Sequence, residues 1–155
     1  METIQLTVIS NSPEETEALG VRLAEQMCSD PSLPPFVALF GDLGVGKTAF
    51  VRGFTSVIAP TSTVRSPTFA LVNEYRAKPR SVFHFDMYRI TGEDDLISIG
   101  FYDYLERPGI CLVEWSENIE DLLPDDRMQV SIEKCSLDRP NERRITIKRI
   151  GEDEP

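Results

Sequence analysis

The chain has 155 residues, of which 26 are acidic and 16 are basic, and its formal net charge is −10; hydrophobic residues make up 41% and charged residues 27%. This length suits one domain, and the composition is typical of a globular protein rather than a disordered one. The negative net charge excludes a nucleic-acid binder that is basic over its whole surface. We expect residues 1–150 to form a single domain and residues 151–155 to form an acidic tail.

Charge is distributed unevenly along the chain. Residues 41–90 carry a net charge of +4, whereas residues 91–130 carry −9. A polyanion would therefore meet the first of these two segments. Its arginines either bind phosphate or RNA, or form a solvated face that pairs with the acidic segment; they are Arg52, Arg65, Arg76, Arg80 and Arg89.

The cysteines and the N-terminus indicate a cellular compartment. Cys28, Cys111 and Cys135 are an odd number without a CxxC pair, which argues against a disulfide framework and a cysteine-based zinc site. The N-terminal sequence lacks the basic start and apolar stretch of a signal peptide, and no run approaches the roughly 18 apolar residues of a membrane span. We therefore expect a soluble, cytoplasmic protein without membrane contact.

The first 40 residues predict a strand, a helix and a second strand. Apolar and polar residues alternate over residues 4–8, as in a half-buried strand. Ser12 is placed to cap a helix that begins with proline, and Glu15 can reach back to the cap. We expect this helix to end near Cys28, and the apolar run at residues 36–40 to form a central strand covered on both faces.

The rest of the chain predicts short helices and strands. Apolar residues recur at helical spacing over residues 47–58, and β-branched and aromatic residues predict a hairpin built from residues 69–75 and 82–89. The further expected elements are short helices at 92–99 and 102–105, a buried strand at 110–115, one or two helical turns at 116–122, and two strands that flank a polar loop at 136–141.

Residues 41–48, with the sequence GDLGVGKT, match the pattern G-x-x-x-x-G-K-[ST] between a predicted buried strand and a predicted helix. The glycines let successive backbone N–H groups face an anion, and the helix N-terminus adds a positive dipole end. Lys47 is suited to neutralise phosphate charge, and the Thr48 hydroxyl to ligate Mg²⁺. The pattern predicts a nucleotide-binding loop, the alternative being a chance match in a glycine-containing loop.

Such a loop also needs an acidic residue to hold its metal ion, and two predicted strands end in one. Asp86 closes the run VFHFD, and Glu114 closes the run ICLVE. The second run has the form of a Walker B strand with Glu in place of the commoner Asp. We expect Glu114 to hold the metal, directly or through water, or to orient the attacking water. A strand-end cap or a surface ion pair is the alternative for either carboxylate.

Three other residues close to these motifs have simpler interpretations. His84, the only histidine, has no partner apparent in the sequence and is interpreted as structural. Cys111 lies within an apolar strand and is interpreted as a small buried hydrophobic residue. Trp115 follows Glu114 directly, and it either covers a ligand or partner or is a half-buried core aromatic.

Five segments occur in an order and with a spacing similar to those of a known family. They are residues 41–54, the SPTF and LVNEY segments at 66–69 and 71–75, HFDMYR at 84–89, and LVEW at 112–115. Together they resemble the bacterial TsaE ATPases, which take part in making threonylcarbamoyladenosine in tRNA. The resemblance covers roughly residues 12–147. Many families share the phosphate loop, whereas the SPTF, HFD and VEW segments together are much more specific.

The resemblance implies a P-loop NTPase-like, three-layer α/β fold with a mixed, strand-rich sheet and few helices. It implies ATP and Mg²⁺ as cofactors, with Lys47, Asp86 and Glu114 as catalytic residues and Thr48, Asp86 and Glu114 at the metal. Residues 66–69 would form a mobile segment near the γ-phosphate. The implied nucleotide contacts are Thr16, Asp42, Leu43, Gly44, Val45, Gly46, Lys47, Thr48, and Arg144 or its neighbour Arg143.

The function implied by the resemblance is ATP binding and hydrolysis that supports a larger assembly. In such systems a TsaB/TsaD-like protein pair transfers threonylcarbamoyl from its adenylate to N6 of an anticodon-loop adenosine. The ATPase drives turnover of that pair or resets it, and its own contact with tRNA is indirect or weak. This chain would then not make the modification itself.

Other function classes share parts of this pattern. A small-molecule P-loop kinase would need an acceptor pocket and an arginine-bearing lid, and no clear lid is evident in the sequence. A GTPase switch would need a guanine-reading segment of the Asn-Lys-x-Asp type, which is absent from the sequence. A purely structural module would be credible only if the loop bound no nucleotide.

Overall fold

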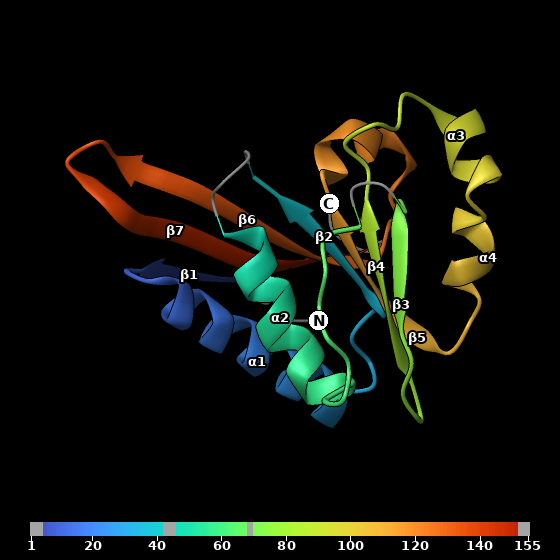
Figure 1. Cartoon of the computed structure of the whole chain (residues 1–155), viewed down its shortest axis with the longest axis horizontal. Helices are drawn as coiled ribbons and strands as arrows, with labels where there is room; N and C mark the ends of the chain where they lie inside the picture. Colours follow the sequence, from blue (N-terminus) through green and yellow to red (C-terminus); the bar gives the residue numbers. More distant parts are fainter. Residues whose placement is uncertain (1–4, 42–45, 68–69, 152–155) are drawn as a thin grey trace.

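The computed structural model describes residues 5–41, 46–67 and 70–151 of the chain. Within them, seven strands form one mixed sheet that has helices on both faces (Figure 1). In chain order the elements are β1 (Gln5–Ser10), α1 (Pro13–Ser29), β2 (Phe36–Phe40), α2 (Lys47–Ile58), β3 (Val72–Tyr75), β4 (Ser81–Asp86), α3 (Glu93–Ser98), α4 (Phe101–Leu105), β5 (Gly109–Glu114), the 3₁₀ helix η1 (Ser116–Leu122), β6 (Arg127–Ser136) and β7 (Arg139–Ile150).

The sheet has a parallel centre and antiparallel margins. Its strand order is β1-β7-β6-β2-β5-β4-β3, in which β6, β2, β5 and β4 are parallel neighbours. On the margins, β3 runs antiparallel to β4, and β7 runs antiparallel to both β6 and β1. The position of β2 confirms the predicted central strand. Because β2, β5 and β4 are parallel, their carboxyl ends meet at one edge of the sheet.

The sheet separates two hydrophobic cores. The first joins α1 and α2 to one face of the sheet, with Phe50 and Phe54 of α2 fully buried there. The second joins the opposite face to α3, α4 and η1, with Phe101 of α4 packed edge-on against Phe85 of β4. Helices thus cover both faces, and the predicted α/β class with a mixed, strand-rich sheet is confirmed.

Helix α1 begins as the sequence predicts. The Ser12 side chain accepts a hydrogen bond from the Glu15 amide at 3.1 Å, which satisfies one free N–H of the first turn. The Glu15 carboxylate accepts from the amide of Asn11, one residue before the expected cap. The helix ends at Ser29, one residue past the prediction. In the described part of the chain, no helix is long and apolar enough to cross a membrane.

Glycines allow α1 and α2 to pack closely. A Cβ atom placed on Gly53 of α2 would lie 1.9 Å from the carbonyl oxygen of Glu17, and one on Gly20 of α1 would lie 2.2 Å from that of Phe50. The two helix backbones are therefore in contact where these glycines face the opposite helix. This packing fixes the position of α2, whose first turn carries Lys47 and Thr48.

We expect the substitution Gly53→Ala to lower the free energy of unfolding by about 1–3 kcal/mol, because the helices must separate to admit the methyl group. Denaturant unfolding measures the change, and Gly92→Ala is the matched control, since nothing lies within 4 Å of a Cβ at Gly92. A Gly53→Ala protein as stable as the wild type would contradict the close packing.

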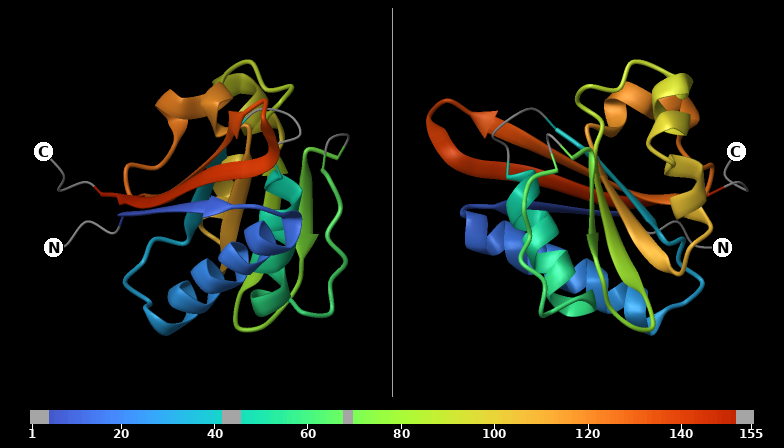
Figure 2. Two further views of the ribbon diagram at one scale, coloured as in Figure 1. Left: turned by 90° about the vertical axis from the view of Figure 1, so that its left-hand side faces the viewer. Right: turned by 45° about the vertical axis from the view of Figure 1, so that its right-hand side comes forward.

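Strand boundaries differ from the prediction in two places. The expected polar loop at residues 136–141 is mostly strand, because β6 and β7 remain paired up to Ser136 and Arg139 and form a long ribbon (Figures 1 and 2). Side chains there are exposed, so the alternation of apolar and polar residues that reveals half-buried strands is missing. The hairpin strands are also shorter than expected: β3 ends at Tyr75 as predicted but begins at Val72, and β4 begins at Ser81 and ends at Asp86 instead of Arg89.

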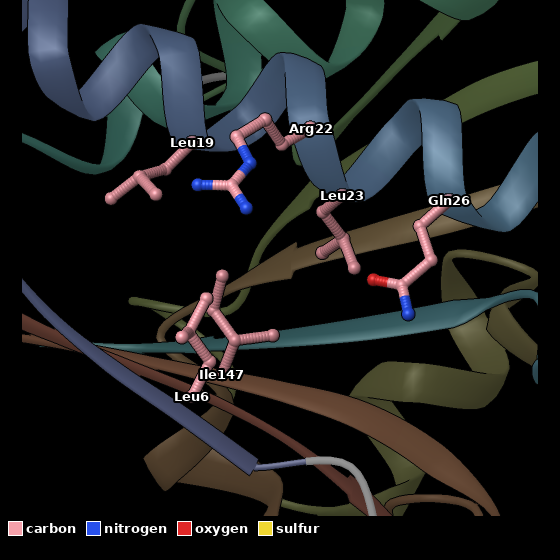
Figure 3. A pocket seen from close by; sticks show the side chains of 6 residues that line it. All are labelled: Leu6, Leu19, Arg22, Leu23, Gln26 and Ile147. Carbon is pink, nitrogen blue, oxygen red and sulfur yellow. The ribbon is translucent and has the colours of Figure 1, made fainter.

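A hollow of about 350 Å³ lies between α1 and the outer strands (Figure 3). The side chains of Arg22 and Gln26 extend into it from the helix, while Leu6 and Ile147 rise from β1 and β7. It therefore contains none of the predicted catalytic or metal-binding residues.

Cys111 is buried in the second core, as the sequence suggests, and burial raises the pKa of its thiol from 9.0 to about 12. Below pH 9 the thiol is protonated in both the folded and the unfolded state. Above pH 9 the unfolded state loses the proton first, so stability falls as pH rises toward 12, by up to roughly 1.4 kcal/mol per pH unit.

We therefore expect the free energy of unfolding to decrease more steeply above pH 9 in the wild type than in Cys111→Ala, which lacks the titrating group. Denaturant unfolding at a series of pH values gives both slopes. As a second readout, the exposed Cys28 should react with a thiol reagent at pH 8 while Cys111 stays protected. Equal slopes in the two proteins would contradict the assignment.

Candidate nucleotide site

The carboxyl ends of the parallel strands bring together residues that are far apart in the sequence. β4 ends at Asp86 and β5 ends at Glu114, and these two residues are direct neighbours in the β4–β5 register. β2 ends at Phe40, immediately before the glycine that opens the predicted phosphate loop. In an open α/β sheet this edge is where ligands bind.

Lys47 is the first residue of α2, and its ammonium group is held over this edge. Its Nζ donates a hydrogen bond to the carbonyl oxygen of Gly41 at 2.7 Å and lies 3.9 Å from the centroid of the Trp115 ring. The side chain is only 5% exposed. Gly46, just before it, has φ 106°, a conformation that favours glycine. Asp42, Leu43, Gly44 and Val45 lie outside the described residues.

Trp115 adopts a left-handed backbone conformation with φ 58°, which is unusual for a bulky side chain. Such a conformation costs about 1–3 kcal/mol and persists only where the surroundings enforce it. It places the indole ring against Lys47 and 5.0 Å from the ring of Tyr88, between centroids. The sequence suggests either a cover over a ligand or partner or a half-buried core aromatic. The ring has features of both, because it is half-buried and also lines the edge beside Lys47.

The two carboxylates at the strand ends are both buried. Asp86 is 6% exposed and accepts a hydrogen bond from the Tyr88 amide at 2.9 Å, while Glu114 is 7% exposed and its Oε2 contacts Nε2 of His84. Two buried carboxylates in adjacent positions concentrate negative charge, which a divalent cation would neutralise. A strand-end cap alone would not require both side chains to be acidic.

The residues present fit a magnesium site of the kind that P-loop proteins use. Among the described residues, no group of three or more His, Cys, Asp or Glu side chains could hold a metal ion by itself. Mg²⁺ commonly binds through one or two carboxylates and takes its other ligands from water and phosphate. Asp86, Glu114 and the hydroxyl of the half-buried Thr48 are suited to that partial set.

Comparison with known proteins identifies the family. The model for the threonylcarbamoyl adenosine biosynthesis protein TsaE matches residues 10–145 of the chain. The chain belongs to the TsaE family. This family is involved in the biosynthesis of threonylcarbamoyladenosine in tRNA and is part of a tRNA-modification system.

Individual relatives agree with the family model. The tRNA threonylcarbamoyladenosine biosynthesis protein TsaE of Bacillus subtilis is 37% identical over 140 residues, which cover 90% of this chain and 83% of the relative. The protein of the same description from Haemophilus influenzae is 41% identical over 97 residues, covering 63% of this chain and 61% of the relative. A crystal structure of Bacillus subtilis YdiB matches with a TM-score of 0.73 and 32% identity, covering 97% of this chain and 89% of the other.

Thr16 and Arg144, the two nucleotide contacts predicted outside the loop, lie in different parts of this TsaE chain. Thr16 is buried in α1, shares a hydrogen bond of 2.8 Å with the Ser10 hydroxyl, and lies beside Gly46 of the predicted phosphate loop. Arg144 is exposed on β7, opposite Ile9 of β1. The position of Thr16 is close to the predicted site, whereas the described contacts do not join Arg144 to Lys47 or to the carboxylates.

Sequence reasoning missed two polar residues that bear on the site. Glu117 of η1 accepts a hydrogen bond from the Gly41 amide at 3.2 Å, and so contacts the first residue of the predicted phosphate loop. His84 is fully buried and contacts both Tyr75 and Glu114, two partners that are not apparent in the sequence. Neither contact leaves a local signal, because the partners lie 76 and 30 residues away in the sequence.

Proposed function

We propose that this TsaE chain binds ATP with Mg²⁺ and hydrolyses it in order to support turnover of a partner assembly that modifies tRNA. The observation that carries the proposal is that Lys47 packs against Trp115, the residue after Glu114, at the sheet edge where Asp86 and Glu114 are buried neighbours. A cation on a helix N-terminus, at the same sheet edge as two adjacent carboxylates, suits a metal-bound phosphate chain.

Each residue has a distinct proposed role. Lys47 would neutralise terminal phosphate charge, exchanging its bond to the Gly41 carbonyl for phosphate oxygens. Thr48 and Asp86 would hold Mg²⁺, and Glu114 would hold it directly or through water, or would orient the attacking water. Bound Mg²⁺ would supply charge neutralisation at the phosphates. Thr16, the loop residues Asp42–Val45 and Arg144 remain proposed contacts of the nucleotide.

The proposed partner is a TsaB/TsaD-like protein pair that carries threonylcarbamoyl from its adenylate to N6 of an anticodon-loop adenosine. Fast hydrolysis needs positive charge on the developing transition state and a positioned water, which are often supplied by a second protein. We therefore propose that the chain is slow alone and is accelerated by the pair, with tRNA contacting it weakly or only through the pair. This work would take place in the cytoplasm.

Steady-state phosphate release tests the proposal. The chain is assayed with Mg-ATP alone, with the partner pair, and with the pair plus tRNA, and GTP replaces ATP in a parallel series. We expect slow release by the chain alone and acceleration by the pair. Rapid release that no partner alters would contradict partner activation, and label found on a small-molecule acceptor instead of in free phosphate would favour a kinase.

A further inference from the structure

Three polar side chains cross three adjacent strands beneath α1 and α2. Tyr75 lies on β3, His84 on β4 and Glu114 on β5, each displaced by two residues from the register neighbour of the previous one. The Tyr75 hydroxyl is 3.0 Å from Nδ1 of His84, and Nε2 of His84 contacts Oε2 of Glu114. His84 has no exposed surface, and Tyr75 is 6% exposed.

At the Tyr75 end of this row of side chains, the hydroxyl is hydrogen-bonded to the backbone of the loop before β3. The Arg65 amide donates to the Tyr75 hydroxyl, and that hydroxyl is also 3.0 Å from the Arg65 carbonyl oxygen. The side-chain amide of Asn73 donates to the same carbonyl at 2.9 Å. Arg65 immediately precedes Ser66 and Pro67, the first two residues of the segment that the family resemblance places near the γ-phosphate.

The contacts form one connected path from Arg65 to Glu114. A tyrosine hydroxyl has one proton to donate and also accepts, and each imidazole nitrogen faces a different partner. Whichever way the Tyr75 proton points, the hydroxyl bridges the loop backbone and the imidazole. Burying polar groups is costly unless all of them are paired, and apolar side chains would fill the same space without that requirement. The path therefore needs an explanation beyond packing.

We propose that Tyr75 and His84 are positioning residues that hold the Glu114 carboxylate and couple its position to the backbone at Arg65. The inference deepens the proposed function and rests on it in one respect, namely that Glu114 serves the metal–nucleotide centre. When a ligand engages Glu114, the imidazole and the tyrosine hydroxyl transmit the change to residues 65–67. In the opposite direction, the same path lets residues 65–67 hold Glu114 in position for hydrolysis.

Two readouts follow the two ends of the path. The chain has a single histidine, so its imidazole resonances in an NMR spectrum report on the Glu114 end without ambiguity. Amide hydrogen exchange at Arg65 reports on the loop end. In the wild type, a non-hydrolysable ATP analogue with Mg²⁺ should shift the His84 resonances and slow exchange at Arg65.

The variant Tyr75→Phe removes the hydroxyl and keeps the ring that packs in the core. We expect exchange at Arg65 to become roughly 5- to 10-fold faster in the ligand-free protein, because its amide loses its acceptor. The nucleotide analogue should still shift the His84 resonances, but exchange at Arg65 should no longer respond. In ATP hydrolysis, kcat should fall about 10- to 100-fold, as is typical when a residue orienting a metal ligand is lost, with a smaller change in KM.

Matched variants separate positioning from a general loss of stability. Tyr102→Phe removes the same hydroxyl from an exposed tyrosine that bonds only Glu93 among the described contacts, and it should match the wild type in both readouts. His84→Gln can still present an amide N–H to Glu114 but is not expected to bridge to Tyr75. It should keep more of the hydrolysis than His84→Leu while losing the response at Arg65.

The outcomes distinguish this inference from the proposed function. If exchange at Arg65 is the same in Tyr75→Phe as in the wild type, or if it still responds to the analogue in that variant, the coupling is refuted. If the analogue leaves the wild-type His84 resonances unmoved, the nucleotide site itself is in the wrong place. The ligand-free comparison at Arg65 remains valid in that case, because it needs no nucleotide.

Discussion

Replacing Lys47 with alanine is expected to weaken the binding of Mg-ATP by about 10- to 100-fold, the range that corresponds to losing a charged hydrogen bond worth roughly 1.5–3 kcal/mol. The ammonium group is buried, is held by the Gly41 carbonyl and lies over Trp115 at this edge. Calorimetric titration with the non-hydrolysable analogue measures the affinity.

Two further variants define what the Lys47 result means. Lys134→Ala removes a lysine from an exposed position on β6 and should leave affinity unchanged. Thr48→Ala should reduce the dependence on Mg²⁺ and the turnover more than the affinity for the nucleotide without metal, because the hydroxyl serves the cation. Wild-type affinity and turnover in both Lys47→Ala and Thr48→Ala would remove the phosphate-loop interpretation.

Glu114→Gln and Asp86→Asn should each lower kcat for ATP hydrolysis on the order of 10²-fold or more while leaving the fold intact. Each change keeps the size of the side chain and removes its charge, so it tests the metal role rather than packing. Glu114→Gln still offers an oxygen to His84, so the buried path of contacts keeps its acceptor. Phosphate release and thermal unfolding are measured on the same preparations.

The exposed Glu120 of η1 provides the control, because Glu120→Gln makes the same chemical change on the surface. Asp86 and Glu114 are neighbours in the sheet register, so the double variant should lose less than the product of the two single losses. A large loss of thermal stability with unchanged activity per folded molecule would instead assign both carboxylates a structural role.

Local patterns predicted the elements that carry the phosphate loop. Helix α2 runs over Lys47–Ile58, as its apolar spacing indicates, and β2 is the central strand that its continuous apolar run predicts. The Ser12 cap of α1 also lies where expected. These features depend on residues close in sequence, where spacing and side-chain chemistry decide the structure.

Features that depend on strand register could not be predicted in the same way. The sequence shows that Asp86 and Glu114 each end a strand, but only the parallel pairing of β4 with β5 makes them neighbours. The contacts of His84 come from residues on both β3 and β5. The strands β6 and β7 stay paired toward their connecting turn, where their side chains are largely exposed. A pattern of alternating side chains cannot report pairings of this kind.

The most direct test of the central claim is the yield of threonylcarbamoyladenosine in tRNA, followed over time in a mixture of the partner pair, the threonylcarbamoyl adenylate and ATP. With the wild-type chain, we expect product to accumulate well beyond one equivalent per partner pair. With Glu114→Gln, product should stop near one equivalent, because the pair is no longer returned to its starting state. Sustained turnover with Glu114→Gln, equal to that with the wild type, would contradict the account.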